Sequence, residues 1–266
     1  MIRDFDKYFS FVKDTLKEKD NDERKPGERF PCSNCTPFGK EDIDNPPFEE
    51  EDWQEFWRLS KENYPLHSVY GGYYGSSKEV IVQSEEYELN SHLDMMHKKV
   101  KKLKGRRVLE IGYGFGGAGL ALIKKGADYT GIDYVSSNPD LPKDRFLEIK
   151  VSGIPENIMN REKFDIIYSY NVFQHLTQAQ RFEYIRQAHE LLKDDGVFFF
   201  SVFERVPGEG LRDNYSTTFF NVHTKVDEPE ELQDFLTETG FEFEHSNKYM
   251  CFETSNAFYV CKKKTA

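Results

Sequence analysis

The sequence has few cysteines and no long hydrophobic stretch, and these two shortages narrow the class of protein. Its four cysteines among 266 residues do not have the dense, even spacing of a secreted disulfide framework. The longest apolar run, Val197 to Phe203, is interrupted by Ser201 and is far too short to cross a bilayer. The first residues lack the basic and apolar regions of a signal peptide, and the last residues form no prenylation box. These features predict a cytoplasmic protein with no membrane partner.

Positive charge is also in short supply, because 36 Lys and Arg face 47 Asp and Glu and give a formal net charge of -11. Such a field repels a phosphate backbone, so nucleic acid is disfavoured as a partner. The basic stretch from Lys98 to Arg107 is a local exception, which we interpret as a solvated face that leads into a strand. Aromatic residues are abundant, with 23 Phe and 15 Tyr, and such side chains line pockets for flat or sugar-like ligands.

The composition and the hydrophobic pattern of the sequence change near residue 100. Residues 1–100 contain Pro- and acid-rich stretches, a Tyr/Gly cluster at 70–75 and short amphipathic patterns, which predict a helical or irregular cap that contributes to a substrate pocket. Residues 101–266 alternate between strand and helix patterns, and this predicts an α/β domain with a doubly wound, mostly parallel sheet. Strands are expected at 107–111, 129–133, 146–151, 164–170, 197–203, 241–249 and 257–262, with helices at 117–125, after the Thr177 and Gln180 capping box, and between Pro229 and Gly240.

The segment after the first expected strand is rich in glycine and reads GYGFGG at positions 112–117. Glycine lets the backbone turn sharply and approach a ligand without a Cβ in the way. The run fits the GxGxxG pattern of dinucleotide-binding proteins, which is weak when taken alone. Glu110 would repel a pyrophosphate but suits a cationic amino-acid ligand, and Asp133 can bind both hydroxyls of a ribose. Adenosine attached to a zwitterionic methionine therefore satisfies both carboxylates, whereas NAD satisfies only Asp133.

In these features the sequence resembles the class I S-adenosylmethionine-dependent methyltransferases, over about residues 101–262. The run from Phe164 to Leu176 is similar to that family's fourth-strand motif, and the run from Leu191 to Phe200 is similar to the segment that leads into its fifth strand. The resemblance implies S-adenosylmethionine as the cofactor and a seven-stranded sheet whose last strand is antiparallel. The cofactor contacts that we expect are Glu110, Gly112, Gly114, Gly116, Asp133, its neighbour Tyr134, and Asn171.

One segment departs from the family pattern. The family commonly has an Asp after the third strand that contacts the adenine amino group, but residues 149–155 read IKVSGIP. Ser152, or the backbone of Val151 and Ile154, is the expected substitute.

The acceptor is expected beyond the carboxyl ends of the fourth and fifth strands, where open α/β sheets bind ligands. His175 and His223 are the candidate general bases, because an imidazole can remove a proton from a hydroxyl near neutral pH. A structural hydrogen bond is the alternative role for each, and Tyr70, Tyr74 and Glu204 are the next candidate bases. The Tyr/Gly cluster and the 204–227 segment are the expected walls and lid of the acceptor pocket. The pocket residues named from these segments are Tyr70, Tyr74, Arg205 and Arg212.

No metal site is predicted. Cys32 and Cys35 form a lone CxxC without two further ligands at metal spacing, so reduced thiols are favoured over a structural zinc site. The sequence NPPF at 45–48 matches a tetrapeptide of some methyltransferases, but no apolar strand precedes it and we interpret it as a proline turn.

The sequence therefore predicts an S-adenosylmethionine-dependent methyltransferase that O-methylates a small polar acceptor, with a hydroxyl of a sugar or nucleotide-sugar as the favoured class. A nicotinamide-dependent oxidoreductase and a non-catalytic S-adenosylmethionine-binding protein are the alternatives. A homo-oligomer is compatible with the sequence.

Overall fold

The computed structural model describes residues 102–114, 116–134, 140–150, 153–170, 172–205, 215–218, 221–227, 229–249 and 254–264. The predictions for residues 1–101, which include the N-terminal cap, the CxxC pair and the Tyr/Gly cluster, lie outside the described residues.

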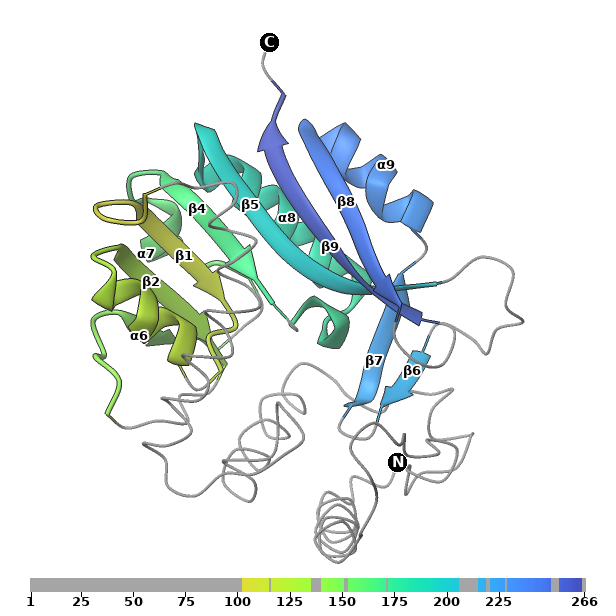
Figure 1. Cartoon of the computed structure of the whole chain (residues 1–266), viewed down its shortest axis with the longest axis horizontal. Helices are drawn as coiled ribbons and strands as arrows, with labels where there is room; N and C mark the ends of the chain where they lie inside the picture. Colours follow the sequence, from red (N-terminus) through yellow and green to blue (C-terminus); the bar gives the residue numbers. More distant parts are fainter. Residues whose placement is uncertain are drawn as a thin grey trace, which may run out of the picture.

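A mostly parallel β-sheet forms the centre of the domain (Figure 1). Its core strands are β1 (Arg107–Ile111), β2 (Asp128–Asp133), β3 (Phe146–Glu148), β4 (Phe164–Ser169), β5 (Leu192–Arg205), β8 (Phe241–Tyr249) and β9 (Thr254–Lys263). These seven strands stand in the order β3-β2-β1-β4-β5-β9-β8, and each neighbouring pair from β3 to β5 is parallel. β9 runs antiparallel to both β5 and β8. The predicted α/β sheet with an antiparallel last strand is confirmed.

A hairpin that the sequence did not predict extends this sheet. β6 (Tyr215–Thr218) and β7 (Asn221–Asp227) pair antiparallel with each other. β7 also pairs in parallel with Phe203 and Glu204 near the end of β5, beyond the point where β4 ends. Part of the 204–227 segment, which was predicted only as a pocket wall or lid, is thus an extension of the sheet past its carboxyl edge.

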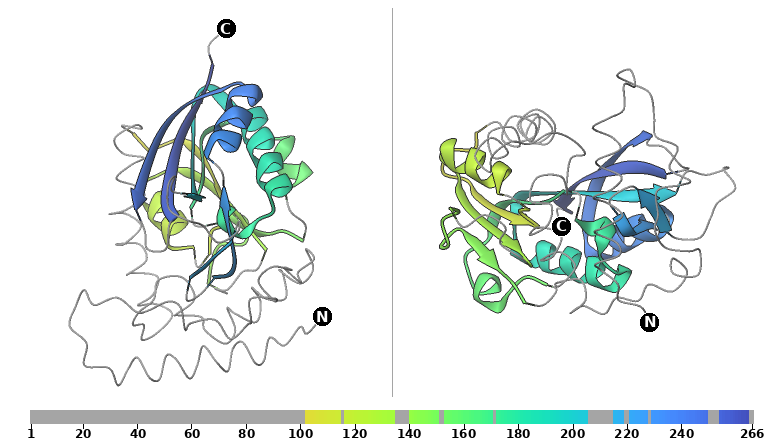
Figure 2. Two further views of the ribbon diagram at one scale, coloured as in Figure 1. Left: turned by 90° about the vertical axis from the view of Figure 1, so that its right-hand side faces the viewer. Right: turned by 90° about the horizontal axis from the view of Figure 1, so that it is seen from below.

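Helices cover the two faces of the sheet. One face carries α6, and the other carries α7, α8 and α9, which gives the layered arrangement of a doubly wound fold (Figures 1 and 2). In the described part of the chain, no helix is long and apolar enough to span a membrane. The helical segments are α6 (Gly117–Lys124), α7 (Glu156–Met159), the 3-10 turn η2 (Phe173–His175), α8 (Gln178–Leu191) and α9 (Pro229–Thr239).

The core is divided between the two faces of the sheet, and β5 shows how. Val197 and Phe199 join the cluster under α6, whereas Phe198 and Phe200 join the cluster under α8 and α9. Successive side chains of a strand point to opposite faces, so an uninterrupted apolar run is what a strand covered on both sides requires.

The predicted helix signals act as expected. Thr177 Oγ1 accepts a hydrogen bond from the Gln180 N–H at 3.2 Å, and Gln180 Oε1 accepts one from the Thr177 N–H at 2.8 Å. This capping box satisfies two backbone donors at the start of α8. Gly240 follows α9 with φ of 96°, a left-handed conformation that ends helices and favours glycine.

The bounds of β2, β3, β4, β5 and β9 differ from the prediction, most of all at the start of β5. β5 begins at Leu192 instead of Val197, because Leu192 pairs with Phe164 before an irregularity in the β4–β5 ladder. β3 ends at Glu148 and is shorter than predicted.

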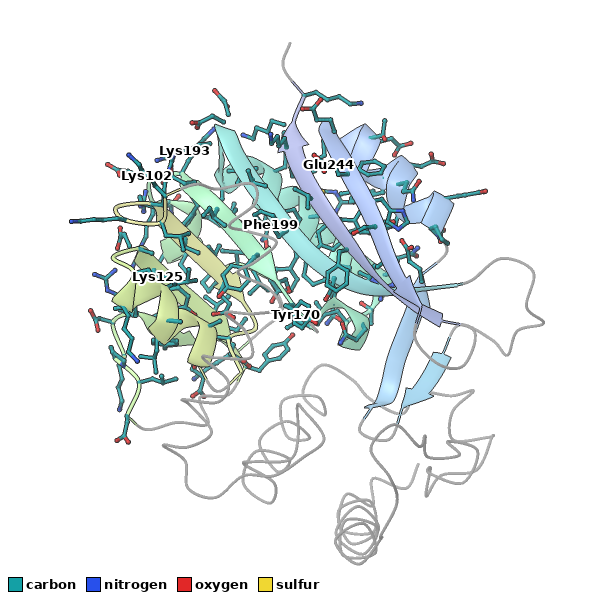
Figure 3. All side chains as sticks on the ribbon, viewed as in Figure 1. Lys102, Lys125, Tyr170, Lys193, Phe199 and Glu244 are labelled. Carbon is teal, nitrogen blue, oxygen red and sulfur yellow. The ribbon has the colours of Figure 1, made fainter. Side chains whose placement is uncertain are left out.

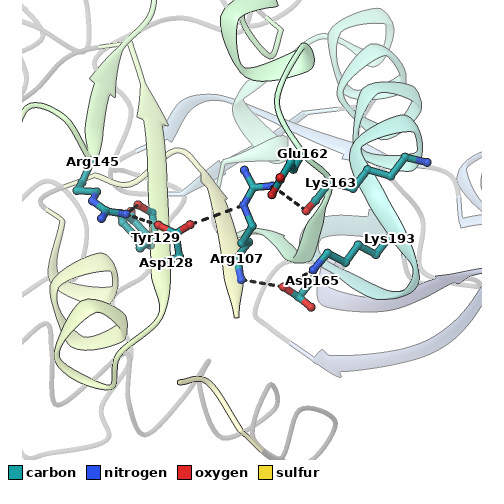
Figure 4. A network of polar contacts seen from close by, with 8 residues as sticks. All are labelled: Arg107, Asp128, Tyr129, Arg145, Glu162, Lys163, Asp165 and Lys193. Atoms are coloured by element: carbon teal, nitrogen blue, oxygen red, sulfur yellow. Dashed lines mark hydrogen bonds and ion pairs between the residues drawn. The ribbon is translucent and has the colours of Figure 1, made fainter. Parts of the chain in front are cut away.

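A polar cluster ties together the amino ends of β1, β4 and β5, away from the glycine loop (Figure 4). The buried Asp165 carboxylate accepts hydrogen bonds from the Arg107 N–H and Arg106 Nη1, each at 2.8 Å, and from Lys193 Nζ at 3.0 Å. Burial raises the pKa of Asp165, but these three donors outweigh it and leave the pKa below its ordinary value.

Candidate active site

The glycine loop between β1 and α6 is built on left-handed backbone. Gly112, Gly114 and Gly116 have φ of 80°, 55° and 82°, a region that residues with a Cβ seldom adopt. The Gly112 N–H donates to the Ile132 carbonyl at 2.7 Å, and the Gly114 N–H donates to Asp133 Oδ2 at 2.7 Å. The loop is therefore held against the end of β2, and the Asp133 carboxylate is oriented by the loop backbone.

The three glycines face different surroundings. A Cβ on Gly112 would lie 2.2 Å from Val172 Cγ2, and a Cβ on Gly116 would lie 2.7 Å from Leu141 Cδ2. No atom of the described residues lies within 4 Å of a Cβ on Gly114. Gly112 and Gly116 are thus required by protein packing, whereas the space beside Gly114 is open and adjoins Asp133; we call this open space the cradle.

Glu110 lies on β1 two residues before the loop and is buried. Its Oε2 accepts a hydrogen bond from the hydroxyl of Tyr129 on β2, which is itself buried. A buried carboxylate requires donors because its charge is unfavourable away from water. The site therefore carries two carboxylates, Glu110 beneath the loop and Asp133 at its rim.

The carboxyl end of β4 lies beside the loop. Ser169 Oγ donates to the Ile111 carbonyl at 3.1 Å and joins β4 to β1. The 3-10 turn η2 follows, and the buried Arg181 of α8 holds it by donating from Nη1 to the carbonyls of Phe173 at 3.3 Å and Leu176 at 3.2 Å. η2 packs against β5 and β7, so this turn lies between the glycine loop and the hairpin.

Gln174 in η2 has an unusual environment. Its side chain is 3% exposed, and its Oε1 accepts no hydrogen bond from the described residues. A buried carbonyl without a donor costs about 1–3 kcal/mol and calls for an explanation.

Two aromatic rings line the same edge of the sheet. Tyr170, at the end of β4 in Figure 3, stacks on Phe258 of β9 with ring centroids 5.8 Å apart and an interplanar angle of 19°. Both rings are partly exposed. Such a pair offers a flat apolar surface with a phenolic hydroxyl at one side.

Glu204, a further candidate base, is fully buried near the end of β5. Its Oε1 accepts a hydrogen bond from the Tyr259 hydroxyl, and its Oε2 lies 2.8 Å from His245 Nε2. Because both oxygens have protein partners, the geometry favours a structural role for this carboxylate over proton transfer.

The model of a methyltransferase domain family matches residues 85–246, which is more than half of the chain. The chain belongs to this methyltransferase family. Its sheet has the class I order with an antiparallel last strand, and S-adenosylmethionine is the cofactor of such domains. Gly114 and Asp133 are joined by a hydrogen bond at this loop, and Glu110 lies on β1 just before it.

Two relatives are ubiquinone biosynthesis O-methyltransferases. That of Actinobacillus pleuropneumoniae serotype 7 (strain AP76) is 31% identical over 124 residues, which cover 42% of this chain and 52% of the relative. That of Azorhizobium caulinodans is 26% identical over 157 residues, which cover 57% of this chain and 58% of the relative. This methyltransferase chain spans little more than half the length of these relatives.

Solved structures share the fold. Magnesium protoporphyrin IX methyltransferase from Synechocystis PCC 6803, with SAM bound, has a TM-score of 0.56 at 12% identity over 82% of this chain and all of that chain. The [4+2]-cyclase SpnF has a TM-score of 0.55 at 14% identity over 80% of this chain and 96% of that chain. At such identities the likeness concerns the fold alone.

The predicted site residues of the methyltransferase divide into three groups. Glu110, Gly112, Gly114, Gly116 and Asp133 lie together around the loop. The backbone positions of His175 in η2 and His223 in β7 belong to elements that pack against each other, but their side chains lie outside the described part. Also outside it are Tyr70, Tyr74, Ser152, Asn171 and Arg212, and the side chain of Arg205.

Two further predicted cofactor contacts are described, Tyr134 just after β2 and Ile154 just before α7. Tyr134 is partly buried against the core, and Ile154 is buried within it. The Ile154 N–H donates to Gln187 Oε1 at 2.7 Å, so a contact from Ile154 to adenine would come from its side chain or carbonyl.

Sequence reasoning missed the residues that support the site, which are Tyr129, Val172, Gln174 and Arg181. The glycines at positions 119 and 131 could have indicated Tyr129. A glycine inside a strand or helix often marks a place where a neighbouring group approaches closely, and here the Tyr129 side chain contacts both positions.

No metal centre is found among the described residues, since no group of three or more His, Cys, Asp or Glu side chains is placed to hold an ion. Cys32 and Cys35 are outside this part of the chain. Cys261 of β9 is buried, and burial raises the pKa of its thiol well above the ordinary value, which disfavours the reactive thiolate.

Proposed function

We propose that this chain transfers a methyl group from S-adenosylmethionine to a hydroxyl of a small molecule. The observation that carries the proposal is the open space at Gly114, whose N–H donates to Asp133, together with the buried Glu110 on β1 before the same loop. A cytoplasmic location goes with this proposal, and cell fractionation tests it.

The cofactor's two ends match the two carboxylates. Asp133 is oriented by the Gly114 N–H and is suited to accept hydrogen bonds from both ribose hydroxyls. Glu110 supplies negative charge for the ammonium of the methionine part. Ser152, or the backbone of Val151 and Ile154, is the proposed adenine contact, and Tyr134 is a further proposed cofactor contact. The sulfonium of the bound cofactor supplies an already activated methyl group, so the protein has to align the acceptor and accept its proton.

The acceptor's proton is assigned to His175 or His223. Their elements, η2 and β7, pack against each other beyond the carboxyl edge of the sheet. This is the side of the loop on which an acceptor would meet the methyl group. Arg205 and Arg212, with Tyr70 and Tyr74, remain the proposed pocket residues.

Two acceptor classes have support. The names of the relatives, ubiquinone biosynthesis O-methyltransferases, favour a ring hydroxyl of a phenol. The aromatic composition and acidic charge favour a sugar or nucleotide-sugar hydroxyl. A second hydroxyl of such an acceptor would donate the hydrogen bond that Gln174 Oε1 lacks among the described residues, while the reacting hydroxyl gives its proton to the base. The stacked rings of Tyr170 and Phe258 suit the flat face of either ring.

The direct test is a methyl-transfer assay with isotopically labelled S-adenosylmethionine and a panel of phenols, catechols, sugars and nucleotide-sugars, read by mass spectrometry. The proposal predicts a labelled methyl ether with one class. Transfer only to amines or carbon atoms would contradict O-methylation, and no transfer despite tight binding of S-adenosylhomocysteine would support the non-catalytic alternative.

A pair of glutamine variants tests the acceptor side. Gln174→Leu removes a buried carbonyl without a donor, so we expect unchanged or higher thermal stability and a KM for the acceptor raised about tenfold, the scale of one hydrogen bond. Gln187→Leu is the matched control, because Gln187 Oε1 already accepts the Ile154 N–H. The control should lose stability and keep its acceptor KM. An unchanged acceptor KM in Gln174→Leu would remove Gln174 from the pocket.

A further inference from the structure

The hydroxyl of Tyr129 lies in a slot that two glycines create. Tyr129 on β2 is fully buried, and its ring contacts Phe146 at 4.9 Å between centroids. A Cβ on Gly131 would lie 2.3 Å from the Tyr129 hydroxyl, and a Cβ on Gly119 of α6 would lie 2.5 Å from it. Neither glycine has a left-handed φ, so both are explained by space for the end of the Tyr129 side chain, and Gly119 also by Phe146 Cε1 at 2.7 Å.

The strand register directs this hydroxyl to Glu110. In the parallel β1–β2 pair, Glu110 is opposite Gly131, and Tyr129 is opposite Val108 two residues earlier. The Tyr129 side chain therefore passes over Gly131, which has no side chain to block it, and donates its hydrogen bond to Glu110 Oε2. The contact joins residues 19 positions apart through the sheet.

The identity of the donor matters for the charge of the site. A lysine or arginine at position 129 would satisfy the buried carboxylate but cancel its charge. A phenol donates one hydrogen bond and brings no charge, so Tyr129 holds Glu110 in one orientation without adding a positive charge that would cancel the carboxylate's. A cationic ligand at the glycine loop requires both properties.

We infer that Tyr129 is a positioning residue for the amino-acid end of the cofactor, acting through Glu110. The inference rests on the proposed function, since it assigns Glu110 to the cofactor's ammonium. Tyr129 is too deeply buried to touch the ligand itself, so its effect must appear as selectivity between ligands with and without that group.

The test compares two ligands by calorimetry on the full chain. S-adenosylhomocysteine carries the amino-acid part, and 5′-methylthioadenosine has the same adenosine without it. We expect Tyr129→Phe to weaken S-adenosylhomocysteine binding about 12- to 140-fold, the scale of a hydrogen bond to a charged group, and to change 5′-methylthioadenosine binding less than about 2-fold. Glu110→Gln should show the same selectivity. In the double variant the second change should add little, because both act on one interaction.

Two further variants keep the outcome interpretable. Tyr184→Phe removes the hydroxyl of another buried tyrosine, in α8 on the opposite face of the sheet, and should leave both affinities unchanged. Gly131→Ala keeps the tyrosine but displaces its hydroxyl, so it should reproduce the selective loss even if Tyr129→Phe fails to fold. Equal weakening of both ligands would show a merely structural role, and unchanged S-adenosylhomocysteine affinity would also overturn the inference. If the wild type binds neither ligand, the proposed function itself is wrong.

Discussion

Replacing Gly114 with alanine isolates the ligand-facing role of the glycine loop. The neighbouring glycines are unsuitable probes, because a Cβ on Gly112 would collide with Val172 and one on Gly116 with Leu141. Gly114 has φ of 55°, and no described atom lies within 4 Å of its Cβ position. Gly105 is the matched control, since it has φ of 76° and equally open surroundings, and it lies before β1 at the amino edge of the sheet.

Because Gly105 and Gly114 have similar backbone angles and open surroundings, the loss of stability and the loss of ligand affinity can be separated. A left-handed residue with a Cβ costs about 1–2 kcal/mol, so both variants should lose similar stability and melt a few degrees lower. At Gly114 the added methyl also occupies the cradle, and overpacking of about 1–3 kcal/mol corresponds to about 5- to 140-fold weaker binding. Calorimetry with S-adenosylhomocysteine and thermal melts of both variants measure the two effects. Equal affinities for Gly114→Ala and Gly105→Ala would refute the placement of the cofactor.

Three other predictions concern the acceptor side and the buried polar groups. Alanine at His175 or His223 should lower turnover by about 10²–10⁴ if that residue is the base, with unchanged S-adenosylhomocysteine affinity; a lower melting temperature at wild-type rate would indicate a structural role instead. Asp165→Asn should lower the free energy of unfolding by about 1–3 kcal/mol at pH 7. Because the pKa of Asp165 is lowered in the folded state, its contribution is present above the ordinary carboxyl pKa and lost as the pH falls through the lowered value. Urea unfolding should therefore show the gap to wild type closing below about pH 4, and a constant gap would contradict this. Glu204→Leu should lose about 1–3 kcal/mol of stability, because two partners are left unpaired, and keep its cofactor affinity; a selective loss of turnover would restore Glu204 as a candidate base.

The parts of this fold that local signals determine were predictable from the sequence. β1 and β8 have their predicted bounds, and the capping box at Thr177 and the glycine after α9 lie where expected. Each of these depends on residues within a few positions of one another. The glycine loop was predictable for a similar reason, because left-handed backbone angles favour glycine at the turning positions themselves.

The missed features depend on contacts between distant residues. The pairing of Tyr129 with Glu110 follows from the register of two parallel strands, which periodicity does not reveal. The β6–β7 hairpin was missed although Val222, Thr224 and Val226 alternate with polar residues along β7, and its pairing with β5 exists only in the folded chain. Arg181 reads as a surface residue of a helix, yet it is buried because the carbonyls of η2 need donors.

The central claim is that Glu110, the glycine loop and Asp133 bind the cofactor, and one calorimetric comparison tests it most directly. Wild-type protein is titrated with S-adenosylhomocysteine and with NADH, and Asp133→Ala is titrated with S-adenosylhomocysteine. The account predicts binding of one S-adenosylhomocysteine per chain, no heat from NADH, and a loss of about 1–3 kcal/mol in Asp133→Ala. Binding of NADH in place of S-adenosylhomocysteine, or full affinity in Asp133→Ala, would contradict it.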